Sequence, residues 1–245
     1  MGPVFIVVIF VAFAALIIFG AIYSYKQQQA RRLALLQLAN KHGWTFDPSN
    51  DYSHDSRFSQ FSIFTAGKSR YAYNTTRGSL KIADADWPLQ YGDFHYQTTS
   101  TSTDSEGRTK TETQTHLLSY VIVESPYLGA PNLFIRKEGI CNRIDSAIGF
   151  DDIDFESVEF SRKFLVRSSD KRFAYDVIAP QMMEFMLATT PPTVDFERGV
   201  CCLYHGGVLK VDDLAATLQW TVEFLGHWPR HVIADLASRL ANPAT

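Results

Sequence analysis

Two neighbouring cysteines followed by a histidine are the residues of this chain whose types best suit metal binding: Cys201, Cys202 and His205. Thiolate and imidazole groups are the usual ligands of zinc. In a β-strand, however, adjacent side chains point to opposite faces, and Cys201 and His205 would lie roughly 13 Å apart along one face. The spacing therefore predicts buried cysteines that pack as small apolar residues, and no zinc site.

A pair of histidines has the spacing of neighbours on one helix face. His227 and His231 are four residues apart, and Pro229 lies between them. Proline suits the first turn of a helix, so the helix is expected to begin near Pro229 and to leave His227 outside it. This removes the geometry that a shared metal ion would need.

An acidic run, from Asp151 through Asp152 and Asp154 to Glu156, offers the oxygen ligands that Ca²⁺ prefers. The run lacks the glycine and the distal glutamate of an EF-hand loop. Its acids also alternate with apolar residues, which is the pattern of a half-exposed strand. We expect a surface strand and no metal site.

Three motifs for nucleophilic catalysis or phosphate binding are not found in the sequence: it has no GxSxG, no GxxxxGK[ST] and no GxGxxG. The prediction is therefore no catalytic residue and no cofactor, and whether the protein is an enzyme is left open, leaning toward no. The alternative is a small-ligand-binding protein or enzyme with a cleft between the sheet and the C-terminal helices. The residues predicted to line that cleft are Trp220, Trp228, His205 and Asp195.

The N-terminal part of the chain is an apolar run. The segment from Pro3 to Tyr23 is almost entirely apolar, and residues 1–25 contain no charged side chain. As a helix the run would be about 30 Å long, the thickness of a bilayer's hydrocarbon core. A basic n-region and a small-residue cleavage site are missing, so we expect a retained transmembrane anchor at residues 1–25, with the lipid bilayer as partner.

Basic residues follow the anchor directly. Lys26, Arg31, Arg32 and Lys41 all precede the first acid, Asp47, whereas no Lys or Arg lies before the anchor. The positive-inside rule then predicts a single-pass protein with its soluble domain in the cytoplasm. The odd number of cysteines, three, fits a reducing compartment.

Three parts of the chain follow from these patterns. After the anchor, the pattern predicts a juxtamembrane helix at residues 26–43 that continues the anchor with little or no break. It predicts a soluble domain at residues 44–245. That domain could hold two subdomains with a boundary near residues 138–156. Small anchor residues such as Ala12 and Gly20 could seat a second helix, so a homo-oligomer stays open. The net charge of −3 argues against a nucleic-acid partner.

From Phe46 to Ile135 the alternation of side chains predicts strands, the first of which starts at Phe58, Phe61, Ile63 and Phe64. The clearest local signal is a pair of Thr-rich polar runs around a turn that contains Gly107. Because neither run has an apolar face, we expect a hairpin that projects into solvent. The residues of this candidate interaction hairpin are Thr98, Thr103, Gly107, Thr111 and Thr115.

The second half mixes helices and strands. Phe160, Phe164 and Val166 are expected on one strand, Asp170 is expected to cap a short helix, and Pro180 to open the next one. The segments TVDFERG, VCCLYHGG and VLKVDD predict a three-stranded meander. A helix capped by Asp212 or Asp213 follows and ends near Gly226, and a last helix starts at Pro229. The class is α+β: a transmembrane helix, then a mainly antiparallel β domain with helices inserted and at the C-terminus.

The segment DIDFESVEFSRKFLVRSSDKRFAYDVIAPQMMEFML, with VCCLYHGGVLKV after it, resembles a family of uncharacterised bacterial single-pass membrane proteins of unknown function. The shared pattern is F-x-x-x-F-x-V, then an acid, an F-A helix start and P-x-x-M. Here its positions are Phe160, Phe164, Val166, Asp170, Phe173, Ala174, Pro180 and Met183. The resemblance implies a bacterial source and an inner-membrane location, and it carries no catalytic residue. The anchor, the exposed polar hairpin and the missing catalytic motifs favour a non-enzymatic interaction or scaffold domain with an unknown protein partner.

Overall fold

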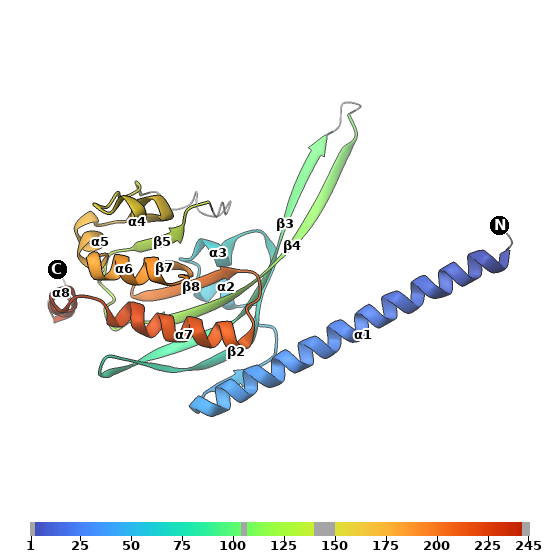
Figure 1. The fold of residues 1–245 in the computed structure, drawn as a ribbon, viewed down its shortest axis with the longest axis horizontal. Helices are drawn as coiled ribbons and strands as arrows, with labels where there is room; N and C mark the ends of the chain where they lie inside the picture. The colour runs from blue at the N-terminus through green and yellow to red at the C-terminus, as the bar shows by residue number, and fades with distance from the viewer. Residues whose placement is uncertain (1–2, 104–106, 140–149, 242–245) are drawn as a thin grey trace.

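A long N-terminal helix stands away from a mixed α/β body in the computed structural model, which describes residues 3–103, 107–139 and 150–241 (Figure 1). Helix α1 runs without a break over Pro3–His42. It is the helix in the described part of the chain that is long and apolar enough to span a membrane, with a mean hydropathy of 1.9. This apolar helix fits a single-pass membrane protein, and it continues without a break past residue 25.

One antiparallel sheet forms the centre of the body. Its strands lie in the order β1-β2-β3-β4-β8-β7-β5-β6. Their bounds are β1 Thr45–Asp47, β2 Lys68–Ile82, β3 Ala85–Thr103, β4 Thr109–Glu124, β5 Leu133–Lys137, β6 Phe164–Ser168, β7 Thr193–Glu197 and β8 Val200–Gly206. Pairing of β4 with β8 joins the strands from both sides of the predicted boundary near 138–156, of which residues 140–149 lie outside the described residues.

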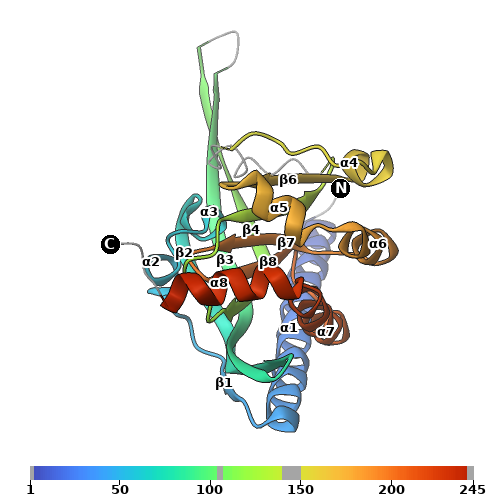
Figure 2. The same ribbon diagram turned by 90° about the vertical axis from the view of Figure 1, so that its left-hand side faces the viewer.

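Helices cover both faces of this sheet, as Figure 2 shows. Their bounds are α2 His54–Arg57, α3 Ser62–Thr65, α4 Val158–Lys163, α5 Lys171–Val177, α6 Pro180–Ala188, α7 Val211–Gly226 and α8 Arg230–Ala241. The larger apolar cluster packs one sheet face against α1 and α4–α8, and a smaller, aromatic cluster packs the other face against α2 and α3. The predicted α+β class is confirmed.

The two cysteines of β8 are placed as expected from the alternation of side chains along a strand. Cys201 belongs to the larger cluster and Cys202 to the aromatic cluster, so the two side chains lie on opposite faces of the sheet. Both are fully buried. Burial in an apolar environment raises the pKa of both thiols, which keeps them protonated and unreactive.

The strand predicted to start at Phe58 is wrong. Phe58, Phe61, Ile63 and Phe64 lie on or beside the short helices α2 and α3. All four are buried in the aromatic cluster. Strand alternation would have sent Phe61 and Phe64 to opposite faces, whereas their spacing of three lets both point into the same cluster.

Two further strand predictions are wrong in the second half. Phe160 lies on helix α4, which Ser157 caps by accepting a bond from the Phe160 amide, and only then does the chain extend into β6. The predicted third strand at VLKVDD is a loop followed by α7. Asp212 and Asp213 lie in the first turn of α7 and Lys210 is the N-cap, so the predicted cap is also wrong. Carboxylates in that turn still favour the helix dipole.

Other predicted helix ends are confirmed. Asp170 caps α5, because its Oδ1 accepts bonds from the amides of Arg172 and Phe173 at 2.9 and 3.2 Å. Pro180 opens α6. Helix α7 ends at Gly226, and α8 begins directly after Pro229.

Substituting this cap gives a first test. We expect Asp170→Ala to lower the free energy of unfolding by about 1 kcal/mol, because two amides at the start of α5 lose their acceptor. Urea unfolding of the full chain in detergent measures the change. Asp176→Ala, which removes a half-buried carboxylate from the last turn of the same helix, is expected to cost less than about 0.5 kcal/mol. Equal losses in the two variants would contradict the role of the cap.

Candidate functional site

The hairpin of β3 and β4 extends far beyond the body as a polar arm (Figure 1). We use "the arm" for Thr98–Thr103 and Thr109–Gln114, which pair in continuous antiparallel register from Thr98 with Gln114 to Thr103 with Thr109. Except for the half-buried Thr98, its described side chains are exposed. Gly107 has a φ of +76°, the positive value expected at the turn.

Both outer edges of the arm are unpaired in the described part of the chain. Strand β2 pairs with β3 only as far as Gln97, and β8 pairs with β4 only from Ser119. The arm is thus a two-stranded ribbon that presents free backbone N–H and C=O groups along both sides. Such edges can accept a further strand from another protein.

At the base of the body an ion pair joins the anchor helix to the sheet. Arg31 of α1 donates from Nε and Nη2 to the two carboxylate oxygens of Asp93 on β3, at 3.1 and 2.7 Å. Asp93 is only 1% exposed. Two parallel bonds of this kind are the strongest form of an arginine–carboxylate pair.

A set of further hydrogen bonds completes this network. Asn74 of β2 and Ser119 of β4 donate to Asp93 at 3.0 and 2.7 Å. The Leu209 amide donates to the Ser119 hydroxyl at 2.9 Å, and Arg31 Nη1 donates to the Leu209 carbonyl. An irregularity in β2 between Tyr73 and Thr76 accompanies the positive φ of Asn74, and such a bulge redirects a side chain. The anchor helix, three strands and the loop after β8 thus share one buried carboxylate.

A histidine is enclosed in the aromatic cluster on the other face of the sheet. His54 is 0% exposed, and its ring lies 4.5 to 5.6 Å from the rings of Phe58, Phe64, Phe94 and Tyr120. Its Nδ1 lies 3.3 Å from Gln90 Nε2 and accepts from it, while Nε2 has no hydrogen-bond partner among the described residues. Burial lowers the pKa of His54 to about 3.

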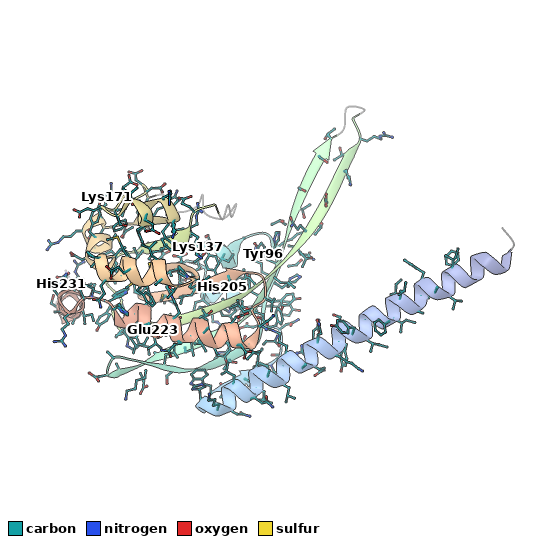
Figure 3. The ribbon with its side chains drawn as sticks, viewed as in Figure 1. Tyr96, Lys137, Lys171, His205, Glu223 and His231 are labelled. Carbon is teal, nitrogen blue, oxygen red and sulfur yellow. The ribbon has the colours of Figure 1, made fainter. Side chains whose placement is uncertain are left out.

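The histidines with metal-like spacing in the sequence lie in separate places. His205 is half-buried on β8, where its Nε2 lies 3.3 Å from Thr217 Oγ1. His227 is the C-cap of α7, and its Nδ1 lies 2.6 Å from the Glu223 carbonyl oxygen. His231 lies on α8, at the far end of the body from His205 (Figure 3). In the described ranges, no three His, Cys, Asp or Glu side chains form a group that could hold a metal ion.

The acidic run shows the expected alternation. Ile153 and Phe155 are buried in the larger cluster, while Asp152 and Asp154 are exposed. The strand itself is reduced to a single bridge between Asp152 and Arg167, where Arg167 Nε also donates to the Asp152 carboxylate at 2.7 Å. An ion pair with a strand residue therefore accounts for one member of the run.

The four residues of the alternative cleft lie in four separate settings. Trp220 is buried between Phe185 and Phe224, and its Nε1 donates to Thr189 Oγ1 at 3.0 Å. Trp228 lines a hollow of 310 Å³ near Trp87, and His205 lines a hollow of 250 Å³ beside His116. These two hollows share no lining residue. Asp195 is buried on β7.

Comparison with known proteins finds a solved structure with a similar fold. No family model matches the chain, and no curated protein matches it. The chain is similar to the crystal structure of the mycobacterial trehalose monomycolate transport factor A, TtfA, with a TM-score of 0.52 over 82% of this chain and 95% of that one. At 13% sequence identity, the likeness concerns the fold alone.

Proposed function

We propose that this chain is a non-enzymatic interaction domain, held at the inner (cytoplasmic) membrane by α1, that binds a membrane-embedded protein through its arm. The observation that carries this proposal is the position and form of the arm. It leaves the body on the same side as the N-terminal half of α1, and it has two unpaired backbone edges (Figure 1). A partner strand could pair with either edge, so the backbone would supply the affinity.

Two other observations support a role beside the membrane. The apolar helix fits a single-pass anchor, and Lys26, Arg31 and Arg32 follow the apolar run directly, which favours a cytoplasmic domain. The structure with a similar fold is described as a transport factor. A role connected with transport is the form of scaffold function that this likeness favours.

Crosslinking in cells tests the proposal. A photoreactive amino acid at Thr111, exposed on the arm, is expected to crosslink the full-length protein to a specific membrane protein. The matched control places it at Leu128, which is exposed on the body. A second variant joins Thr99 to Thr113, which face each other in register, through an Asn-Gly turn that removes the outer arm.

The expected result is a crosslink from position 111 and none from 128, with the same partner lost from pull-downs of the shortened variant. Melting curves of the shortened variant check that its body is folded. The proposal is wrong if the partner is recovered equally with and without the arm, or if position 111 gives no product above background.

A further inference from the structure

A pocket of about 920 Å³ lies between α1, the sheet and the loop after β8. Its α1 wall begins at Ser24, directly after the apolar run that ends at Tyr23, and continues to Arg32. At 1.5 Å per residue, Ser24 to Arg32 covers about 12 Å along the helix. The headgroup layer of a bilayer is about 5–8 Å thick, so this wall runs through the headgroup region and just past it.

Two cations of the pocket are not neutralised. Arg31 is paired with the buried Asp93, but Arg32 and Lys210, which also line the pocket, have no carboxylate partner in the described part of the chain. Arg32 is half-buried and Lys210 is exposed, and they come from opposite walls, α1 and the loop after β8. The pocket therefore presents a net positive charge, and its Arg32 lies just past the headgroup layer of the bilayer.

An apolar rim lies beside these cations. Leu117 of β4 and Val208 of the loop both line the pocket, and they are 44% and 38% exposed. A parallel bridge between Leu118 and Gly207 holds the two segments together. Exposed apolar side chains at the mouth of a charged pocket suit a ligand that is part anion and part hydrocarbon.

The sheet explains why these side chains converge. Alternation along β3 places Asp93 and His95 on the same face as Leu89 and Tyr91 of the larger cluster. The apolar core of that face thus ends, on the side of the anchor, in a polar pocket. His95 is fixed there by stacking on Tyr71 at 4.5 Å.

We propose that this pocket binds the phosphate headgroup of an anionic phospholipid from the membrane that holds α1. Arg32 and Lys210 contact the phosphate, and Leu117 and Val208 contact the first part of an acyl chain. This inference depends on the anchor but not on the arm or on a protein partner, so it goes beyond the interaction proposed above.

Lipid retention by the full-length protein tests the proposal. The protein in a neutral detergent is mixed with equal amounts of phosphatidylglycerol and phosphatidylcholine of the same acyl chains, and retained lipid is counted by native mass spectrometry. We expect selective retention of phosphatidylglycerol. The double variant Arg32→Gln/Lys210→Gln is expected to bind it about thirty-fold more weakly, from two lost cation contacts.

The matched control is Lys26→Gln/Lys41→Gln, which removes the same charge from two exposed juxtamembrane lysines outside the pocket. It is expected to retain phosphatidylglycerol within about three-fold of the unsubstituted protein. Melting curves check that both double variants are folded. An equal loss in the two variants would mean that only the general basic charge attracts lipid, and the proposal would be wrong.

A competition experiment distinguishes a bound lipid from a bound free anion. Inorganic phosphate and glycerol phosphate are added as competitors at millimolar concentration. We expect neither to displace phosphatidylglycerol, because they lack the hydrocarbon that the rim contacts. Displacement by either, or equal retention of phosphatidylcholine, would overturn the assignment of the pocket to an anionic lipid.

Discussion

Replacing Arg31 with methionine is expected to lower the free energy of unfolding by about 3 kcal/mol, the largest effect that we expect from a single substitution outside the apolar core. The substitution leaves the Asp93 carboxylate buried with only the Asn74 and Ser119 donors. A buried charge that loses its partner retains the full cost of its desolvation. For a domain of this size the melting temperature should fall by about 6–12 °C.

Urea unfolding of the full chain in detergent, followed by tryptophan fluorescence, measures this effect. All four tryptophans lie between Trp44 and Trp228, outside the anchor, so the signal reports on the body. The control is Arg172→Met, which removes a guanidinium that is largely exposed and lies 3.8 Å from Asp176. This control is expected to cost less than about 0.5 kcal/mol.

A double variant tests the physical reason. Arg31→Met combined with Asp93→Asn removes both charges, so no uncompensated charge is left inside, and part of the lost stability should return. The double variant could instead be less stable than Arg31→Met by the full cost of a second, independent substitution. In that case the uncompensated desolvation of the Asp93 carboxylate would not be the cause of the stability lost in Arg31→Met. A loss below about 1 kcal/mol in Arg31→Met would contradict the prediction itself.

The same ion pair has a consequence for the proposed function. Arg31 lies eight residues after Tyr23, the end of the apolar run, and Asp93 lies on β3, the strand that continues into the arm. Trp44, just after α1, adds a second contact, since its ring lies over Gly78 of β2 in space that a Cβ would fill. The anchor is thereby fixed to the strands at two places, which sets the direction of the arm relative to the membrane helix.

The parts of this fold that depend on local sequence could be predicted. The apolar run, the Asp170 cap, the proline at the start of α6 and the polar hairpin each depend on residues within a few positions of one another. The placement of Cys201 and Cys202 on opposite faces followed from strand alternation alone. These signals also gave the α+β class.

Short helices were missed because their signals are weak. Four residues, as in α2 and α3, make barely one turn, and apolar residues at that length fit a strand or a helix equally well. The residues of the loop Val208–Lys210 have the β-propensity of a strand. The loop nevertheless bends, so that the Leu209 backbone forms hydrogen bonds with Ser119 and Arg31. Tertiary hydrogen bonds decided that conformation, and no local pattern encodes them.

The juxtamembrane pocket could not be predicted either, because its residues are distant in sequence. Arg31 is separated from Asp93 by 62 positions and from Leu209 by 178. One signal was available: Asp93 stands between aromatic residues in YGDFHY, at an inward position of an otherwise core-forming strand. An acid in such a position needs a cation, and the basic cluster after the anchor is where one could have been sought.

Acid is expected to destabilise the body through His54. The folded protein keeps this ring neutral, since burial lowers its pKa to about 3, whereas in the unfolded chain it takes up a proton near its ordinary value of about 6.5. Below pH 6.5 the unfolded state therefore binds one more proton than the folded state. The free energy of unfolding then falls by about 1.4 kcal/mol per pH unit, which amounts to about 3 kcal/mol at pH 4 from this residue alone.

His54→Phe isolates this contribution from the carboxylates that also titrate. Phenylalanine has the shape for a site lined by Phe58, Phe64 and Phe94, and it removes an Nε2 that has no partner among the described residues. Gln90 still donates to Tyr120 Oη at 3.2 Å.

We expect the His54→Phe variant to be within about 1 kcal/mol of the unsubstituted protein at pH 7. At pH 4 we expect it to be more stable than that protein by about 3 kcal/mol. The measurement is urea unfolding of both proteins at each pH. If the free energy of unfolding of the two proteins changed with pH in parallel, His54 would take up its proton in the folded state as readily as in the unfolded chain. The aromatic cluster would then have to open and admit water around the charge.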